Sequence, residues 1–162
     1  MKKNILALGL MMNAWMVNAQ EVLRVQNGAT LSVQNSGAIT IQGGITLENG
    51  SSVINDGSIT LKNNSVSNQS DWLDNSLLGA MSGTGMVMFN SSNGNNFTGP
   101  TSFFDVFMDA AGGLTLNNDL TGSNKLRFIN GKINTGSNYI FLNNNSAASL
   151  ENDVSNTGYA NT

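Results

Sequence analysis

Two acidic residues, Asp71 and Asp74, flank Trp72 and are the closest approach to a reactive constellation in this sequence. Glycoside hydrolysis needs two carboxyl groups across a cleft, and an aromatic ring beside them could stack on a sugar. One interpretation is therefore a polysaccharide lyase or hydrolase, although the nearest base in the sequence is Lys62. The simpler interpretation, which we favour, is that the acids keep a loop soluble while Trp72 and Leu73 fill the core.

The chain contains no Cys and no His. It therefore lacks disulfides, thiolate metal sites, the commonest general base and the commonest transition-metal ligand. Oxygen ligands for calcium are present, but none stands in an EF-hand or a glycine-aspartate nonapeptide pattern. We therefore assign no catalytic, cofactor-binding or metal-binding residue and expect no cofactor. The dispersed acidic residues considered as calcium ligands are Glu48, Asp56, Asp105, Asp109 and Asp119.

Basic side chains are equally sparse. Seven Lys and Arg against ten Asp and Glu give a net charge of −3, which argues against a surface that follows nucleic-acid phosphates. Lys125, Arg127 and Lys132 fall on expected strands, where they keep the outer faces soluble. A hydrophobic content of 40% with so little net charge favours a folded chain over a disordered one.

Residues 1–19 are typical of a secretory signal peptide. Lys2 and Lys3 supply the positive start, an apolar stretch runs over residues 5–17, and Val-Asn-Ala at 17–19 offers a cleavage site. The apolar stretch is shorter than the roughly 20 residues of a membrane-spanning helix. We therefore predict a cleaved signal peptide, no membrane span after cleavage, and a secreted or cell-surface location for the rest of the chain.

From residue 22 onward, short runs alternate between apolar and polar residues, which is the period-two pattern of half-buried strands. Turn dipeptides such as Asn49-Gly50 separate them. Leu31, Ile45 and Ile59 recur every fourteen residues, and similar residues between them shorten the repeat length, here called the beat, to about seven residues. This repetition predicts an all-β repeat solenoid, specifically a right-handed parallel β-helix. Two or three strands per turn fit this beat, and we prefer three.

Antiparallel hairpins are the alternative, because Asn-Gly and Asp-Gly are also strong hairpin turns. Near-uniform connections and residues that recur in register favour the solenoid. We expect the recurring Asn35, Asn49 and Asn63 to form a hydrogen-bonded ladder between coils. The alternation also directs Thr46 outward to solvent. The residues predicted to share one apolar core are Leu31, Val33, Ile39, Ile41, Ile45, Leu47, Ile59 and Leu61.

Four segments follow the signal peptide. Residues 20–65 are predicted to form short-period β-repeat coils, and residues 66–82, which lack the alternation, an irregular loop or short helix across the solenoid. Residues 83–142 continue the solenoid with an aromatic, thicker core. Residues 143–162 are polar and are expected to begin further repeats, because they contain no capping element. An uncapped coil has unpaired backbone groups, so we expect self-association through its edge.

Four segments stand out in the second half. Residues 83–90, 113–121 and 130–138 are rich in Gly and Asn, and residues 103–108 are an apolar run between them. They resemble β-repeats in large surface proteins of Bacteroidetes-type bacteria that use type IX secretion. The resemblance covers residues 83–145 well and residues 22–65 loosely, and the end of the signal peptide is also similar. It implies β-helix stalks or surface modules ahead of adhesion domains and a C-terminal sorting domain, which would lie beyond Thr162.

These patterns predict an exported structural or adhesive β-solenoid module, not an enzyme. Repeated polar groups on long solenoid faces suit weak, extended contact with glycans or other cell surfaces. The alternative is a fragment of a carbohydrate-active β-helix enzyme whose catalytic residues lie downstream. Clustered Asp, Arg or Lys on one downstream face would favour the enzyme, whereas further Gly/Asn repeats would favour the stalk.

Export predicts a processed amino terminus. Mass spectrometry of the protein recovered from the culture medium or the cell surface should show a chain that begins at Gln20, either free or cyclised, because cleavage is expected after Ala19. Exported protein that retains Met1 would contradict the signal-peptide assignment.

Overall fold

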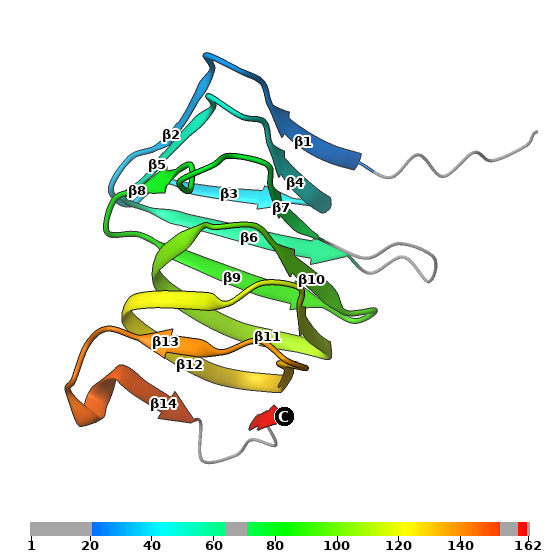
Figure 1. Cartoon of the computed structure of the whole chain (residues 1–162), viewed down its shortest axis with the longest axis vertical. Helices are drawn as coiled ribbons and strands as arrows, with labels where there is room; N and C mark the ends of the chain where they lie inside the picture. The colour runs from blue at the N-terminus through cyan, green and yellow to red at the C-terminus, as the bar shows by residue number, and fades with distance from the viewer. Residues whose placement is uncertain (1–20, 64–70, 153–158, 162) are drawn as a thin grey trace, which may run out of the picture.

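The computed structural model describes residues 21–63, 71–152 and 159–161 of the chain (Figure 1). The strands wind into stacked coils, and each paired strand runs parallel to its partner in the neighbouring coil. Figure 1 shows these coils succeeding one another along the long axis, from β1 to β14. The architecture is a parallel β-solenoid of about six turns. The predicted solenoid is confirmed, and the antiparallel hairpin alternative is wrong.

Each turn has three faces, as preferred from the seven-residue beat. The first face contains β1 (Glu21–Val25), β4 (Gly43–Leu47), β7 (Trp72–Asp74) and β10 (Asn95–Thr98). The second face contains β2 (Thr30–Val33), β5 (Ser52–Asn55) and β8 (Met81–Ser82). The third face contains β3 (Ala38–Ile41), β6 (Ser58–Asn63) and β9 (Met86–Ser91).

Two long strands, β11 (Ser102–Leu116) and β12 (Leu120–Asn134), bend around corners and so contribute to more than one face. Residues 105–108 of β11 pair with β9 on the third face, and residues 114–116 pair with β10 on the first face. The register between β11 and β12 shifts at three places. Such bulges let a paired strand bend, so the two faces form one continuous sheet.

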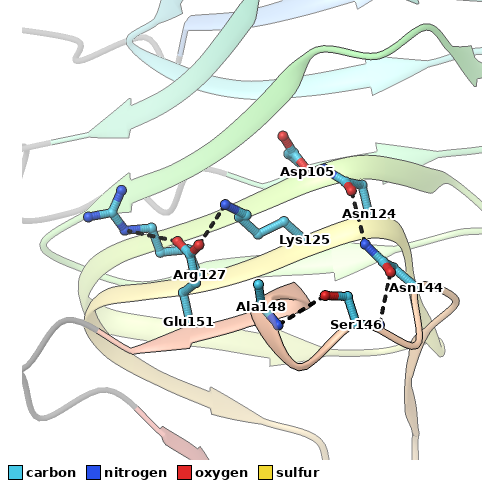
Figure 2. Close-up of polar contacts among 8 residues, drawn as sticks. All are labelled: Asp105, Asn124, Lys125, Arg127, Asn144, Ser146, Ala148 and Glu151. Atoms are coloured by element: carbon cyan, nitrogen blue, oxygen red, sulfur yellow. Dashed lines mark hydrogen bonds and ion pairs between the residues drawn. The ribbon is translucent and has the colours of Figure 1, made fainter.

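The polar segment 143–162 contributes to the stack. β13 (Ile140–Leu142), β14 (Leu150–Asn152) and β15 (Tyr159–Asn161) all pair in parallel with β12. A short 3-10 helix, η1 (Ala147–Ser149), precedes β14. The Ser146 hydroxyl accepts a hydrogen bond from the Ala148 amide at its start (Figure 2). The described residues of this segment therefore continue the stack beyond β12, and β13 precedes them.

The fourteen-residue recurrence in the sequence is not the stacking interval of the coils. Leu31 pairs with Val53, and Ile39 pairs with Ile59, twenty residues later. Three seven-residue beats make one turn, so residues fourteen apart lie on different faces. Leu31, Ile45 and Ile59 accordingly fall on β2, β4 and β6, one on each face. Stacked partners are about twenty residues apart, which the shorter period conceals.

The expected Asn ladder exists, but other residues form it. Asn124 donates from Nδ2 to Asp105 Oδ1 at 2.7 Å, and Asn144 donates to Asn124 Oδ1 at 3.1 Å (Figure 2). These residues are nineteen and twenty positions apart, which is one turn. The three Asn residues expected to form a ladder do not stack, because Asn35 follows β2, Asn49 follows β4 and Asn63 ends β6, each on a different face.

The irregular segment predicted over residues 66–82 requires correction. Part of it lies outside the described residues. In the described part, β7 pairs with β4 on one side and β10 on the other, and β8 pairs with β5. These residues therefore belong to an ordinary coil. The sequence shows no apolar–polar alternation here because β7 has only three residues and β8 only two, too few for a period of two to be recognised.

All eight residues predicted to point inward belong to the core, six of them buried and Leu31 and Ile39 packed against it. In the following coils, Phe103 contacts three aromatic neighbours. Its ring centroid lies 5.0 Å from that of Trp72, 5.4 Å from that of Phe97 and 6.1 Å from that of Phe89. All four side chains are fully buried, so aromatic residues fill the core of these coils.

The corner between the second and third faces is a column of glycines. Ser58 donates its amide to Gly37 O at 2.9 Å, and Met86 donates to Gly57 O at 2.9 Å. A Cβ at position 57 would lie 2.2 Å from Gly37 O, and one at position 85 would lie 2.4 Å from Gly57 O. No side chain fits between these backbones, so glycine is required where the coils stack this closely.

The in/out register predicts opposite outcomes for two adjacent substitutions. Ile59 is fully buried, whereas its neighbour Thr60 faces outward. Ile59→Asp should lower the free energy of unfolding by at least about 4 kcal/mol, because it buries an unpaired carboxylate and leaves a gap. Thr60→Asp should cost about 1 kcal/mol or less. Urea denaturation followed by circular dichroism measures both, and equal losses would show that this register is wrong.

Candidate functional site

The acid pair suggested by the sequence is divided by the sheet. Successive side chains of a strand point to opposite faces, so residues 71 and 74 cannot share one. Trp72 points inward, is fully buried, and donates from Nε1 to Thr101 Oγ1 at 2.8 Å. Its ring therefore cannot stack on a sugar. The simpler interpretation placed both Trp72 and Leu73 in the core. Trp72 does fill the core, whereas Leu73 faces outward and that prediction was wrong.

Asp74 holds the loop between β7 and β8. Its side chain is only 3% exposed. Oδ1 accepts a hydrogen bond from the Ser76 amide at 2.9 Å, and Oδ2 accepts from the Ala80 amide at 3.2 Å. Oδ2 also accepts from Thr101 Oγ1, one coil away, at 2.5 Å. These bonds satisfy both carboxylate oxygens within the protein, so Asp74 has a structural role.

Asp71 lies at the outer side of the first face, beside a hollow of about 250 Å³. The hollow spans several coils, since its residues come from β1, β4, the start of β7, β10 and the turn after β11. It is thus built from segments nearly a hundred positions apart in the sequence. The residues that line it are Val22, Gly44, Ile45, Thr46, Asp71, Leu73, Asn96, Thr98 and Asn117.

A glycine permits the close approach that forms one side of the hollow. A Cβ at position 44 would lie 2.8 Å from the carbonyl oxygen of Asp71, inside contact distance. That same oxygen accepts a hydrogen bond from the Ile45 amide at 2.8 Å. Because Gly44 has no side chain, the backbone at Asp71 can pack directly against β4. The Asp71 carboxylate is thereby placed at the surface of the first face.

Thr46 corrects the expectation that it would be exposed. Its side chain faces outward as the alternation requires, yet the residue is only 7% exposed. In the strand register it lies between Arg24 on β1 and Leu73 on β7. These longer side chains on both neighbouring strands account for its low exposure. An outward position on a central strand is therefore not always an exposed one.

The polar groups of the hollow are held in fixed positions by their neighbours. Asp71 Oδ1 accepts hydrogen bonds from both the amide and the side-chain Nδ2 of Asn96, each at 3.0 Å. One coil further on, Asn117 donates from Nδ2 to Thr98 Oγ1 at 2.9 Å. These bonds orient Asp71 and Asn117, and a carboxylate and an amide each retain further acceptor capacity.

The charge of the hollow is negative. Among its lining residues, as the structure describes them, Asp71 is charged and no Lys or Arg is present. Arg24, which lies next to Thr46 in the register, is paired with Glu48 through a contact of 2.8 Å between Nη1 and Oε1. The hollow therefore offers hydrogen-bond acceptors and one negative charge, surrounded by small polar and aliphatic groups.

The predicted basic side chains of the third face serve coil-to-coil contacts (Figure 2). Lys125 Nζ lies 2.6 Å from Glu151 Oε1, and Arg127 Nε lies 3.9 Å from Glu151 Oε2. The Arg127 guanidinium also lies over the Phe107 ring, 5.7 Å from its centroid. Partly exposed ion pairs of this kind contribute little stability each. They join β12 to β14 and leave Lys125 and Arg127 engaged with neighbouring coils.

The acidic residues considered as calcium ligands are dispersed, as expected. Each accepts a hydrogen bond or forms an ion pair with a group on a neighbouring coil: Glu48 with Arg24, Asp56 with Thr84, Asp105 with Asn124, Asp109 with Asn90, and Asp119 with the Tyr139 amide. Within residues 21–63, 71–152 and 159–161, no cluster of three or more acidic residues could hold a metal ion.

Comparison with known protein families, curated proteins and solved structures finds no match to this chain. In the part of the chain that the structure describes, no helix is long and apolar enough to cross a membrane.

The sequence indicated Asp71 as a candidate residue but did not indicate the hollow, because Gly44, Asn96, Thr98 and Asn117 belong to no local sequence pattern. Only the true coil length brings them to one face.

The two acids of the original pair should respond differently to substitution. Asp74→Ala should lower the free energy of unfolding by about 3 kcal/mol, because it leaves buried donors without an acceptor. Asp71→Ala removes a partly exposed side chain and should cost about 1 kcal/mol. Urea titrations of both variants against the unsubstituted protein compare them directly. A larger loss for Asp71→Ala than for Asp74→Ala would contradict the roles assigned here.

Proposed function

We propose that this chain is an exported structural and adhesive β-solenoid module of a secreted or cell-surface protein. The observation that supports this proposal is the stack of parallel coils around one apolar core, seen across the described residues. Two features of the sequence support the location. Residues 1–19 have the pattern of a signal peptide, and the segments rich in Gly and Asn resemble type IX-secreted surface proteins of Bacteroidetes-type bacteria.

A stalk must be stiff along its axis, and this stack has the interactions for it. Backbone hydrogen bonds join every coil to the next through the strand pairs. Side-chain bonds run in the same direction, as in the column Asp105, Asn124 and Asn144 (Figure 2). Because both sets of bonds lie along the solenoid axis, bending would break many of them at once. We infer a spacer role from this geometry.

Adhesion requires contact groups on the outside, and the surface has two kinds. The hollow on the first face presents oriented polar groups. Apolar side chains stand exposed elsewhere: Leu77 and Leu78 are 82% and 94% exposed, and Tyr139 and Phe141 form an exposed pair with ring centroids 6.1 Å apart. Contacts through one small hollow or a few apolar side chains are individually weak, but their affinities combine when a repetitive surface makes many of them at once.

We propose that the chain binds and does not turn over its ligand. Within this segment, the candidate for catalysis on a sugar was Asp71 and Asp74 acting together beside Trp72. Their placement on opposite faces of the sheet, with Trp72 buried, removes that combination. Binding remains the activity that the surface groups favour.

The proposal is tested by location and by binding. Protease shaving and surface labelling of intact native cells should detect the chain outside the cell, and the purified protein should co-sediment with insoluble polysaccharides such as cellulose, chitin or mannan. Reducing-sugar assays with and without chelator should detect no cleavage. A cytoplasmic protein that sediments with none of these polymers would overturn the proposal. Glycan cleavage abolished by Asp71→Asn would instead favour the enzyme.

A further inference from the structure

We propose that the hollow on the first face is a binding site for a single neutral or amino-substituted sugar ring, held by its hydroxyl groups. This inference names the ligand class for the adhesive role and rests on that proposed function. The site consists of Asp71, Asn96, Thr98 and Asn117, with Leu73 and Val22 as its apolar part. The ring hydroxyls donate to the Asp71 carboxylate and the Asn117 side-chain carbonyl.

The acceptors are arranged before any ligand arrives. Asp71 uses Oδ1 for the amide and Nδ2 of Asn96, both at 3.0 Å, which fixes the plane of its carboxylate. A carboxylate has about four acceptor sites, so Oδ2 remains available to a donor. Asn117 uses Nδ2 for Thr98 Oγ1 at 2.9 Å, which leaves its carbonyl oxygen as an acceptor. Asn117 lies two strands from Asp71 in the register, so hydroxyls on opposite sides of one sugar ring are the donors that reach both acceptors. Bonds to a charged acceptor are the stronger kind.

The size of the hollow suits one sugar ring inside it. Its volume of about 250 Å³ is below the roughly 300–1,000 Å³ of sites that enclose drug-sized ligands. Leu73 and Val22 supply aliphatic surface against which the C–H groups of a sugar can pack. A ligand of this size in a small hollow should bind with a dissociation constant on the order of 1 mM.

The charge of the hollow decides which sugars are admitted. Asp71 is its charged lining residue, and no basic side chain from the described residues lines the hollow. The neighbouring Arg24 is neutralised by Glu48 at 2.8 Å. A uronic acid would place its carboxylate near that of Asp71 without a cation between them, which is unfavourable. Neutral sugars, and amino sugars that carry a positive charge, avoid this repulsion.

The experiment is a titration of the ¹⁵N-labelled protein, followed by NMR, with three probes: methyl β-glucoside, glucosamine and glucuronate. Methyl β-glucoside and glucosamine should shift the amide signals of Gly44, Leu73 and Asn96. The dissociation constant of glucuronate, taken from the same signals, should be at least tenfold higher. Asp71→Asn keeps an oxygen for Asn96 but removes the charge. It should weaken both sugars about tenfold, which corresponds to about 1.4 kcal/mol.

Asp109→Asn is the matched control. Asp109 also accepts a hydrogen bond from an Asn side chain on the neighbouring coil, Asn90 at 2.7 Å, but it lies on the third face. The same substitution there removes the same charge and leaves the hollow intact, so sugar binding should be unchanged. An equal loss in both variants would mean that net charge, not the hollow, governs binding, and would overturn the proposal.

Two further outcomes would also overturn the proposed sugar site. Glucuronate that binds as tightly as glucosamine would contradict the inference that the negative charge of Asp71 excludes acidic sugars. Shifts of the same amides by calcium chloride alone, with none by sugars, would make the hollow a cation site. Failure of the site is distinguishable from failure of the adhesive function: co-sedimentation with polysaccharides that is insensitive to Asp71→Asn refutes the site alone. Sugar binding by a protein that stays in the cytoplasm refutes the exported role alone.

Discussion

The spacing between coils is the constraint on which this structure depends. Parallel strands of a sheet lie about 4.8 Å apart, so every coil must repeat the path of the last one at that distance. At the corner between the second and third faces, only glycine fits, because a Cβ at position 57 would lie 2.2 Å from the Gly37 oxygen. Where the chain bends more gradually, β11 and β12 use bulges instead. The inner faces then close on one continuous apolar core.

The same spacing explains how a chain with so little charge satisfies its polar groups. Side chains in one column repeat at the coil distance, so an amide can donate to the oxygen of the residue above it. Asp105, Asn124 and Asn144 form such a column (Figure 2), and Asn117 and Thr98 form another pair. Ion pairs such as Lys125 with Glu151 are few and partly exposed. Side-chain hydrogen bonds from Asn amides to the neighbouring coil therefore satisfy many polar groups of the surface.

Alternation across the sheet assigns the acidic residues of β7 and its flank to different tasks. Asp74 points inward and satisfies Ser76, Ala80 and Thr101. Asp71 is placed at the outer surface because Gly44 allows the backbone to approach β4. A segment that looked like one catalytic pair is thus one structural residue and one surface residue. The surface residue, together with Asn96 and Asn117 from later coils, forms the proposed sugar site.

The sequence by itself determined the strands, their inward sides and the apolar core, because the period of two is local to each strand: Ile45 and Leu47 needed no distant information. It predicted the parallel solenoid as well. The tertiary structure decided which residues stack. Three strands per turn place Ile39 beside Ile59 and Asn124 beside Asn144, whereas the fourteen-residue recurrence suggested other partners. Strands of two or three residues, such as β7, show no period. The hollow depends on contacts across several turns, which no local pattern encodes.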